Sequence, residues 1–141
     1  MPQYATSISI QANQQDVWKA LSDVSRWHEW TSTVTKVEVL DAPEIQLNHR
    51  YKVFQPKLQP VVWTVTILEA PVIFTWESHM PGMTMIAEHE LRAVGPKQTD
   101  LFLTFSFHGF LGEIMGRFTR KTAEEYMRTE AESLKKHVEG K

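Results

Sequence analysis

The chain has 141 residues, of which 42% are hydrophobic and 23% charged, a balance typical of a globular protein rather than a disordered one. Fifteen basic and 17 acidic residues leave a net charge of −2, which predicts no strong electrostatic field for nucleic acid or anionic lipid. The absence of cysteine excludes disulfides, thiolate metal sites and cysteine nucleophiles.

The first part of the chain predicts one strand followed by two short helices. Residues 4–10 alternate between polar and apolar side chains with the period of two expected of a strand. Asn13 is a typical N-cap residue with an acidic residue three positions later, so a first helix should begin there. Ser25 is a candidate cap for a second short helix that carries Trp27 and Trp30 on one face.

Between residues 33 and 107 the pattern is that of short strands separated by turn-forming residues. β-Branched and aromatic side chains are frequent, and proline or glycine marks most of the breaks. Because the connections suit hairpins, the sheet should be mainly antiparallel. The expected strands cover residues 33–40, 49–54, 61–68, 72–78, 84–94 and 101–107.

Alternation within these strands predicts which side chains share a face. In residues 61–68, one face carries Trp63, Val65 and Ile67. The inner faces of the last two strands are expected to carry Met85, Ala87, His89 and Leu91, and Leu101, Leu103, Phe105 and Phe107.

The segment from Gly109 to Val138 contains no proline and predicts one long C-terminal helix. Its side chains form two stripes at helical spacing. We expect the first stripe to face a concave interior and the second to pack against a sheet edge or the short helices. The first stripe is Met115, Phe118, Thr122 and Tyr126, and the second is Ala123, Met127, Ala131, Leu134 and Val138.

Three parts of the chain carry a resemblance to a known family: residues 16–23 followed by two tryptophans, residues 63–76, and the Pro81-Gly82 turn followed by His89-Glu90-Leu91 and the helix. Together they resemble the START-like (SRPBCC) helix-grip superfamily, in particular the stand-alone bacterial polyketide cyclase/dehydrase-like proteins. The resemblance implies a single START-like domain over residues 1–141. It also implies an α+β fold in which a curved, about seven-stranded antiparallel sheet and two short helices wrap around the C-terminal helix. Members bind lipids, hormones or polyketides, and some cyclise or dehydrate polyketides.

Aromatic and methionine side chains on the expected inner faces favour a cavity for a hydrophobic small molecule, without a cofactor. The alternative is that the same side chains fill a packed core. The expected ligand-binding walls are Trp63, Trp76, Met85, Phe105, Met115 and Phe118.

Three polar side chains are candidates for selecting the ligand. His89 lies among small or apolar neighbours, and an inward imidazole with a pKa near neutrality would act as a general acid or base or orient a carbonyl. The alternative is a histidine satisfied by a backbone carbonyl or by water. Tyr126 and Tyr51 are possible hydroxyl anchors, and the alternative for them is a place at the rim with the hydroxyl in water.

Two charged clusters have ordinary explanations. Residues 88–90 read Glu-His-Glu, but adjacent strand side chains point to opposite faces, so we predict no metal site. Arg117, Arg120 and Lys121 are followed by two glutamates, which indicates a solvated, ion-paired face. The sequence contains no P-loop, GxGxxG, GxSxG or HExxH motif, so nucleotide-dependent and serine-hydrolase functions lack support.

Three functions therefore remain. The first is the binding of a lipid-, polyketide- or aromatic-like molecule, and the second is a polyketide cyclase or dehydratase in which His89 moves protons. The third is an interaction module that uses a polar outer face with Glu88, Glu90 and Arg92. We expect a cytoplasmic monomer or homodimer, because no leader pattern or bilayer-length apolar run is present and edge strands can pair.

Overall fold

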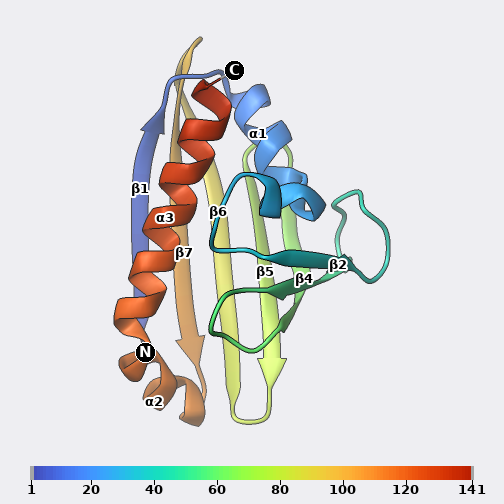
Figure 1. Cartoon of the computed structure of the whole chain (residues 1–141), viewed down its shortest axis with the longest axis vertical. Helices are drawn as coiled ribbons and strands as arrows, with labels where there is room; N and C mark the ends of the chain where they lie inside the picture. The colour runs from blue at the N-terminus through green and yellow to red at the C-terminus, as the bar shows by residue number, and fades with distance from the viewer. Residues whose placement is uncertain (1, 141) are drawn as a thin grey trace.

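The computed structural model describes residues 2–140 and contains a seven-stranded antiparallel sheet with the helices that flank it (Figure 1). The elements in chain order are β1 (Gln3–Ile10), α1 (Gln14–Ser22), the 3₁₀ helix η1 (Val24–Glu29), β2 (Lys36–Val39), β3 (Arg50–Phe54), β4 (Val61–Glu69), β5 (Ile73–Met80), β6 (Met83–Gly95), β7 (Gln98–His108), α2 (Phe110–Phe118) and α3 (Arg120–Glu139).

The strand order is β1-β7-β6-β5-β4-β3-β2, so β1 and β2 form the two edges of the sheet. From β2 onward every strand pairs with its neighbour in sequence through a short connection. The segment with α1 and η1 carries the chain from one edge to the other, and α3 lies across β1 and β7 (Figure 1). This arrangement confirms the α+β helix-grip prediction.

The two short helices differ in how well the sequence predicted them. The side chain of Asn13 accepts a hydrogen bond from the backbone N–H of Asp16 at 2.8 Å, which confirms the expected N-cap of α1. The second helix follows Asp23 rather than a Ser25 cap and is a 3₁₀ helix that ends before Trp30. The indole of Trp27 is buried and donates to the carbonyl of Leu21 at 2.9 Å, so this tight corner depends on a side-chain bond.

A bulge in β4 overturns one predicted face. Val65 lies opposite Trp76, whereas Ile67 lies opposite Thr75, so β4 contains one extra residue at this point. The alternation shifts by one position beyond the bulge. Ile67 is therefore 46% exposed, and Leu68 packs against the core in its place.

The C-terminal segment forms two helices rather than the single predicted helix. The interruption falls at Thr119, whose backbone N–H and hydroxyl both donate to the carbonyl of Met115, at 2.9 and 2.7 Å. The second predicted stripe is confirmed, because α3 packs against β1, β7 and α1. Its buried residues are Met127, Ala131, Leu134 and Val138.

Candidate functional site

A cavity of about 470 Å³ lies between the inner face of the sheet, the first half of α3 and the loop that joins β3 to β4. Its volume falls in the range of about 300–1,000 Å³ typical of small-molecule sites. Six of the side chains that the sequence predicted for a ligand site lie along its walls. They are Trp63, Trp76, Met85, Phe105, Met115 and Tyr126.

One small side chain and several large aromatic ones share the cavity wall. Trp76, Ala87 and Phe105 pair across β5, β6 and β7, so a methyl group stands between two rings on the inner face. Trp63 stacks on Trp76 with ring centroids 5.5 Å apart and 20° between the planes. It also meets the ring of Phe105 edge-on at 5.9 Å. These contacts fix the rings of Trp63, Trp76 and Phe105 in place along the cavity wall.

The cavity opens at one end of the molecule. Leu58, Met80 and Met115 line the cavity and are also 42%, 38% and 43% exposed, so they mark its mouth. They come from the β3–β4 loop, the end of β5 and α2. The N–H of Leu111 donates to the carbonyl of Gly82 at 2.8 Å and joins α2 to the β5–β6 hairpin at this end (Figure 1).

His89 lies at the inner end of the cavity, as its strand pattern predicted, and is 4% exposed. Its ring stacks on Phe74 with a centroid distance of 4.1 Å, and Nδ1 lies 3.2 Å from the carbonyl oxygen of the same residue. A carbonyl only accepts, so Nδ1 carries the hydrogen and Nε2 of the neutral ring is an acceptor. Burial lowers the pKa of His89 to about 4, so the expectation of a pKa near neutrality is wrong.

Glu130 on α3 is the functional candidate that sequence analysis missed. Its Oε2 lies 4.0 Å from Nε2 of His89, and its side chain is only 16% exposed. Burial raises the pKa of the Glu130 carboxyl to about 8. At neutral pH, therefore, an uncharged imidazole faces a carboxyl that is mostly protonated. Glu130 follows Tyr126 by four residues, as Tyr126 follows Thr122, so it continues the helical stripe on which Tyr126 was predicted. This spacing could have revealed Glu130.

The hydroxyl of Tyr126 is not a free anchor. It donates to the carbonyl of Pro56, whereas the ring lines the cavity. The bond joins α3 to the β3–β4 loop, which supplies Leu58 and other residues to the cavity wall. Tyr126 therefore holds one wall of the cavity in place.

Two predicted ligand contacts lie outside the cavity. Tyr51 is fully buried, its hydroxyl donates to the carbonyl of Pro43 at 3.2 Å, and burial raises its pKa to about 12. Phe118 is 82% exposed, so its predicted inward position is wrong. The reason is that α2 and α3 are separate helices, and Phe118 lies on the opposite side of α2 from its buried glycines.

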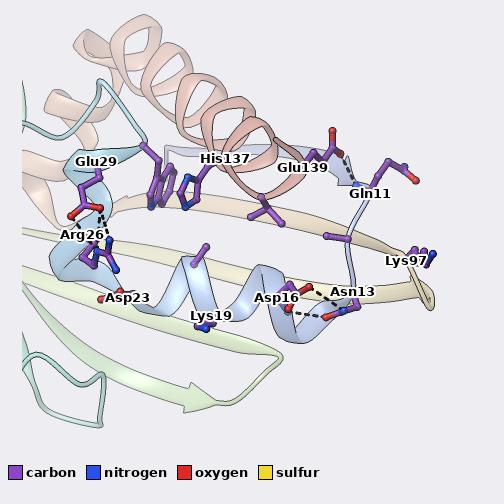
Figure 2. Close-up of a pocket in the computed structure, with 14 residues that line it drawn as sticks. Gln11, Asn13, Asp16, Lys19, Asp23, Arg26, Glu29, Lys97, His137 and Glu139 are labelled. Atoms are coloured by element: carbon purple, nitrogen blue, oxygen red, sulfur yellow. Dashed lines mark hydrogen bonds and ion pairs between the residues drawn. The ribbon is translucent and has the colours of Figure 1, made fainter. Parts of the chain in front are cut away.

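A second hollow of about 700 Å³ lies between α1, η1 and the end of α3 (Figure 2). Its walls are polar and carry charges of both signs. Arg26 bonds Glu29 at 2.9 Å, and the carboxylate of Glu139 accepts from the N–H of Gln11 at 2.6 Å (Figure 2). Because these groups already satisfy one another, the apolar cavity is the stronger candidate for a ligand site.

Residues 2–140 include no group of three or more histidine, aspartate or glutamate side chains placed to hold a metal ion. Within the same range, no helix is long and apolar enough to cross a membrane.

The curved antiparallel sheet, the helix across it and the cavity between them define a helix-grip fold. The sequence profile of the family described as polyketide cyclase/dehydrase and lipid transport matches residues 1–139. The chain belongs to that family. No curated protein matches it.

Solved structures share the fold at low sequence identity. Zhui aromatase/cyclase from a Streptomyces species aligns with a TM-score of 0.80 and 16% identity over 97% of this chain and 93% of its own. A START superfamily protein from Mycobacterium smegmatis aligns with a TM-score of 0.75 and 13% identity over 98% of this chain and 97% of its own. The protein XoxI from Bacillus cereus aligns with a TM-score of 0.79 and 9% identity over 98% of this chain and 96% of its own. At these identities the likeness establishes the fold alone.

Proposed function

We propose that the protein binds a hydrophobic small molecule in the cavity above Ala87. The observation that carries this proposal is the cavity of about 470 Å³ whose walls include the rings of Trp63, Trp76 and Phe105. Removal of an apolar ligand from water provides the driving force, at about 25 cal/mol for each Å² of apolar surface buried. Fixed aromatic walls favour flat or ring-containing ligands, whereas Met85 and Met115 adapt to differences in shape.

The inner end of the cavity favours a ligand with an uncharged polar group. Nε2 of His89 accepts a hydrogen bond, and the protonated carboxyl of Glu130 donates one. A hydroxyl placed between them satisfies both. A ligand carboxylate in the same position would face a second carboxyl without a buried cation, which is unfavourable.

The test fills part of the cavity and measures affinity. Ala87→Phe places a ring in the cavity, and we expect at least tenfold weaker binding of the neutral probe N-phenylnaphthylamine, with a loss of about 1–3 kcal/mol in unfolding free energy from overpacking. Ala93→Phe is the matched control, because Ala93 lies on the same strand but is exposed. Binding is followed by probe fluorescence and by quenching of the tryptophans. Equal affinity in Ala87→Phe and the wild type would contradict the proposal.

The pair of His89 and Glu130 favours a second candidate, a dehydratase or cyclase that uses the same cavity. With a β-hydroxyketone, Nε2 of His89 takes the proton from the carbon between the two oxygenated carbons. The Glu130 carboxyl gives its proton to the departing hydroxyl, so a C–O bond breaks, a C=C bond forms and water leaves. The low pKa makes His89 a weak base, but the carboxylate formed 4.0 Å away stabilises the imidazolium. The family description and the fold shared with an aromatase/cyclase support this candidate.

A β-hydroxyketone with an aromatic or alkyl tail tests the reaction, since the enone product absorbs in the ultraviolet. We expect Glu130→Gln to lower turnover at least a hundredfold while the affinity for N-phenylnaphthylamine changes less than threefold. Glu125→Gln is the control on an exposed position of α3. If the wild type binds the probe but forms no enone, the enzymatic candidate is rejected and the binding function stands.

A further inference from the structure

Helix α2 has its small side chains inside and its bulky apolar side chains outside. Gly112 and Gly116 are its buried residues. A Cβ on Gly116 would lie 2.6 Å from side-chain atoms of Pro2, and one on Gly112 would lie 3.2 Å from the backbone of Phe107. The glycines therefore let the helix backbone lie directly against the body of the protein.

The opposite face of α2 is apolar and open to solvent. Phe110 and Phe118 are 77% and 82% exposed, and their two rings alone present roughly 300 Å². A helix on the surface of a globular protein normally turns such residues toward the core. We call the exposed stripe the docking face, and its residues are Phe110, Leu111, Ile114, Met115 and Phe118.

The docking face is continuous with the mouth of the cavity. Met115 belongs to both, and the exposed Leu58 and Met80 extend the apolar rim beyond the helix. Both α2 and the β5–β6 hairpin lie at the same end of the molecule (Figure 1). An apolar molecule that enters or leaves the cavity passes over this surface.

Arg117 lies on α2 itself, and Arg120 and Lys121 follow it closely in sequence at the start of α3, although the whole chain carries a net charge of −2. Arg117 and Arg120 are 78% and 69% exposed, and their ion pairs with Glu113 and Glu124 are wide, at 3.7 and 3.6 Å. Lys121 follows on the next helix and is exposed. Wide, exposed pairs contribute little, so both guanidinium groups are available to form stronger, bidentate bonds with phosphate.

We propose that the docking face inserts into the headgroup region of a phospholipid bilayer, with the basic side chains on anionic lipid phosphates. An apolar face with phenylalanines beside arginine and lysine is the pattern of interfacial helices. A second copy of the chain is the weaker occupant, because one nine-residue helix provides less than the about 800 Å² that each partner contributes to a stable interface. The continuity with the cavity also fits a bilayer, which is a source and a sink of apolar ligands.

Sedimentation with vesicles tests the proposal. The wild type should bind vesicles of equal parts phosphatidylcholine and phosphatidylglycerol. For the double variant Phe110→Ser with Phe118→Ser, the partition coefficient onto these vesicles should fall at least about tenfold. Leu47→Ser with Val94→Ser is the control, because these two residues are exposed elsewhere. Arg117→Gln with Lys121→Gln should weaken binding to these vesicles but not to pure phosphatidylcholine.

Two results would overturn the proposal: wild-type protein that stays in the supernatant, or vesicle binding that the phenylalanine variant retains. A dimer that dissociates in that variant, seen by analytical ultracentrifugation without vesicle binding, would assign the face to a second copy. Neither phenylalanine lines the cavity, so the variant should bind N-phenylnaphthylamine in solution like the wild type. Failure of docking is thereby distinguished from failure of the ligand site.

Discussion

Nε2 of His89 lies 4.0 Å from Oε2 of Glu130, so an imidazole from strand β6 and a carboxyl from α3 face each other inside the molecule. Burial moves the two pKa values in opposite directions, to about 4 and about 8, and each shift favours the uncharged form. Glu130 should therefore lower the stability of the folded protein at high pH, and His89 should lower it at low pH.

Glu130 should make the protein less stable as the pH rises. The folded-state pKa of about 8 is above the ordinary value of 4.5, so the folded protein keeps a proton that the unfolded chain releases. Stability is greatest below pH 4.5 for this group and falls until about pH 8, by on the order of 5 kcal/mol. Glu130→Gln should match the wild type at the acidic end and exceed it at the alkaline end in denaturant unfolding. A constant difference between the two proteins across this range, or the same change in Glu125→Gln, would contradict the assignment.

His89 should destabilise the protein in acid. Its folded-state pKa of about 4 is below the ordinary 6.5, so the unfolded chain takes up a proton first. Stability from this group is complete above pH 6.5 and is lost as the pH falls toward 4, by on the order of 3 kcal/mol. His89→Leu should be less stable at neutral pH because it loses the stack on Phe74, but its stability should fall less between these pH values. His28→Leu, at an exposed position, should keep the wild-type slope.

The bond from Tyr126 to the carbonyl of Pro56 should restrain the β3–β4 loop. Tyr126→Phe removes the hydroxyl and should cost about 1 kcal/mol in unfolding free energy. Limited trypsin digestion should then cut faster after the exposed Lys57. Tyr51→Phe is the matched control, since it removes a hydroxyl bonded to Pro43 in a different loop. Equal cleavage after Lys57 in both variants would show that the tether does not restrain the loop.

Gly109 should be intolerant of a side chain. Its φ of +87° lies in the left-handed region, and a Cβ there would come 2.7 Å from the carbonyl oxygen of Gly82. Gly109→Ala should lower the unfolding free energy by about 1–3 kcal/mol, because strain and a backbone clash combine at the junction of β7, α2 and the hairpin. Gly95→Ala meets nothing within 4 Å and should change stability by no more than about 0.5 kcal/mol. Thermal unfolding of both variants measures this difference, and equal stability of the two variants would contradict the prediction.

Periodicity predicted the sheet well where the backbone stays regular. The alternation of β6 placed Ala87 and His89 inside, and both are buried. It failed at Ile67 because a bulge adds a residue without a glycine or proline to mark it. It also failed at Thr119, where the helix is interrupted although most of the surrounding residues are strong helix formers.

The site was harder to predict because two of its residues lie where their residue types seldom do: a glutamate is buried and a phenylalanine is exposed. Glutamate on a helix normally lies in water, so Glu130 drew no attention despite its spacing from Tyr126. Helical phase also placed Phe118 inside, since apolar residues usually face a core. Only the packing of Gly112 and Gly116 shows that α2 is turned the other way. The pKa values of the buried pair likewise depend on burial that no local pattern encodes.

The edges of the sheet have a further consequence. Because β1 and β2 do not pair with each other, the sheet is open and its strand hydrogen bonds do not form a closed barrel. Helices cover the two edges instead, since η1 contacts β2 and α3 packs against β1. A change in the distance between the two edges would therefore be opposed by helix packing and not by strand hydrogen bonds.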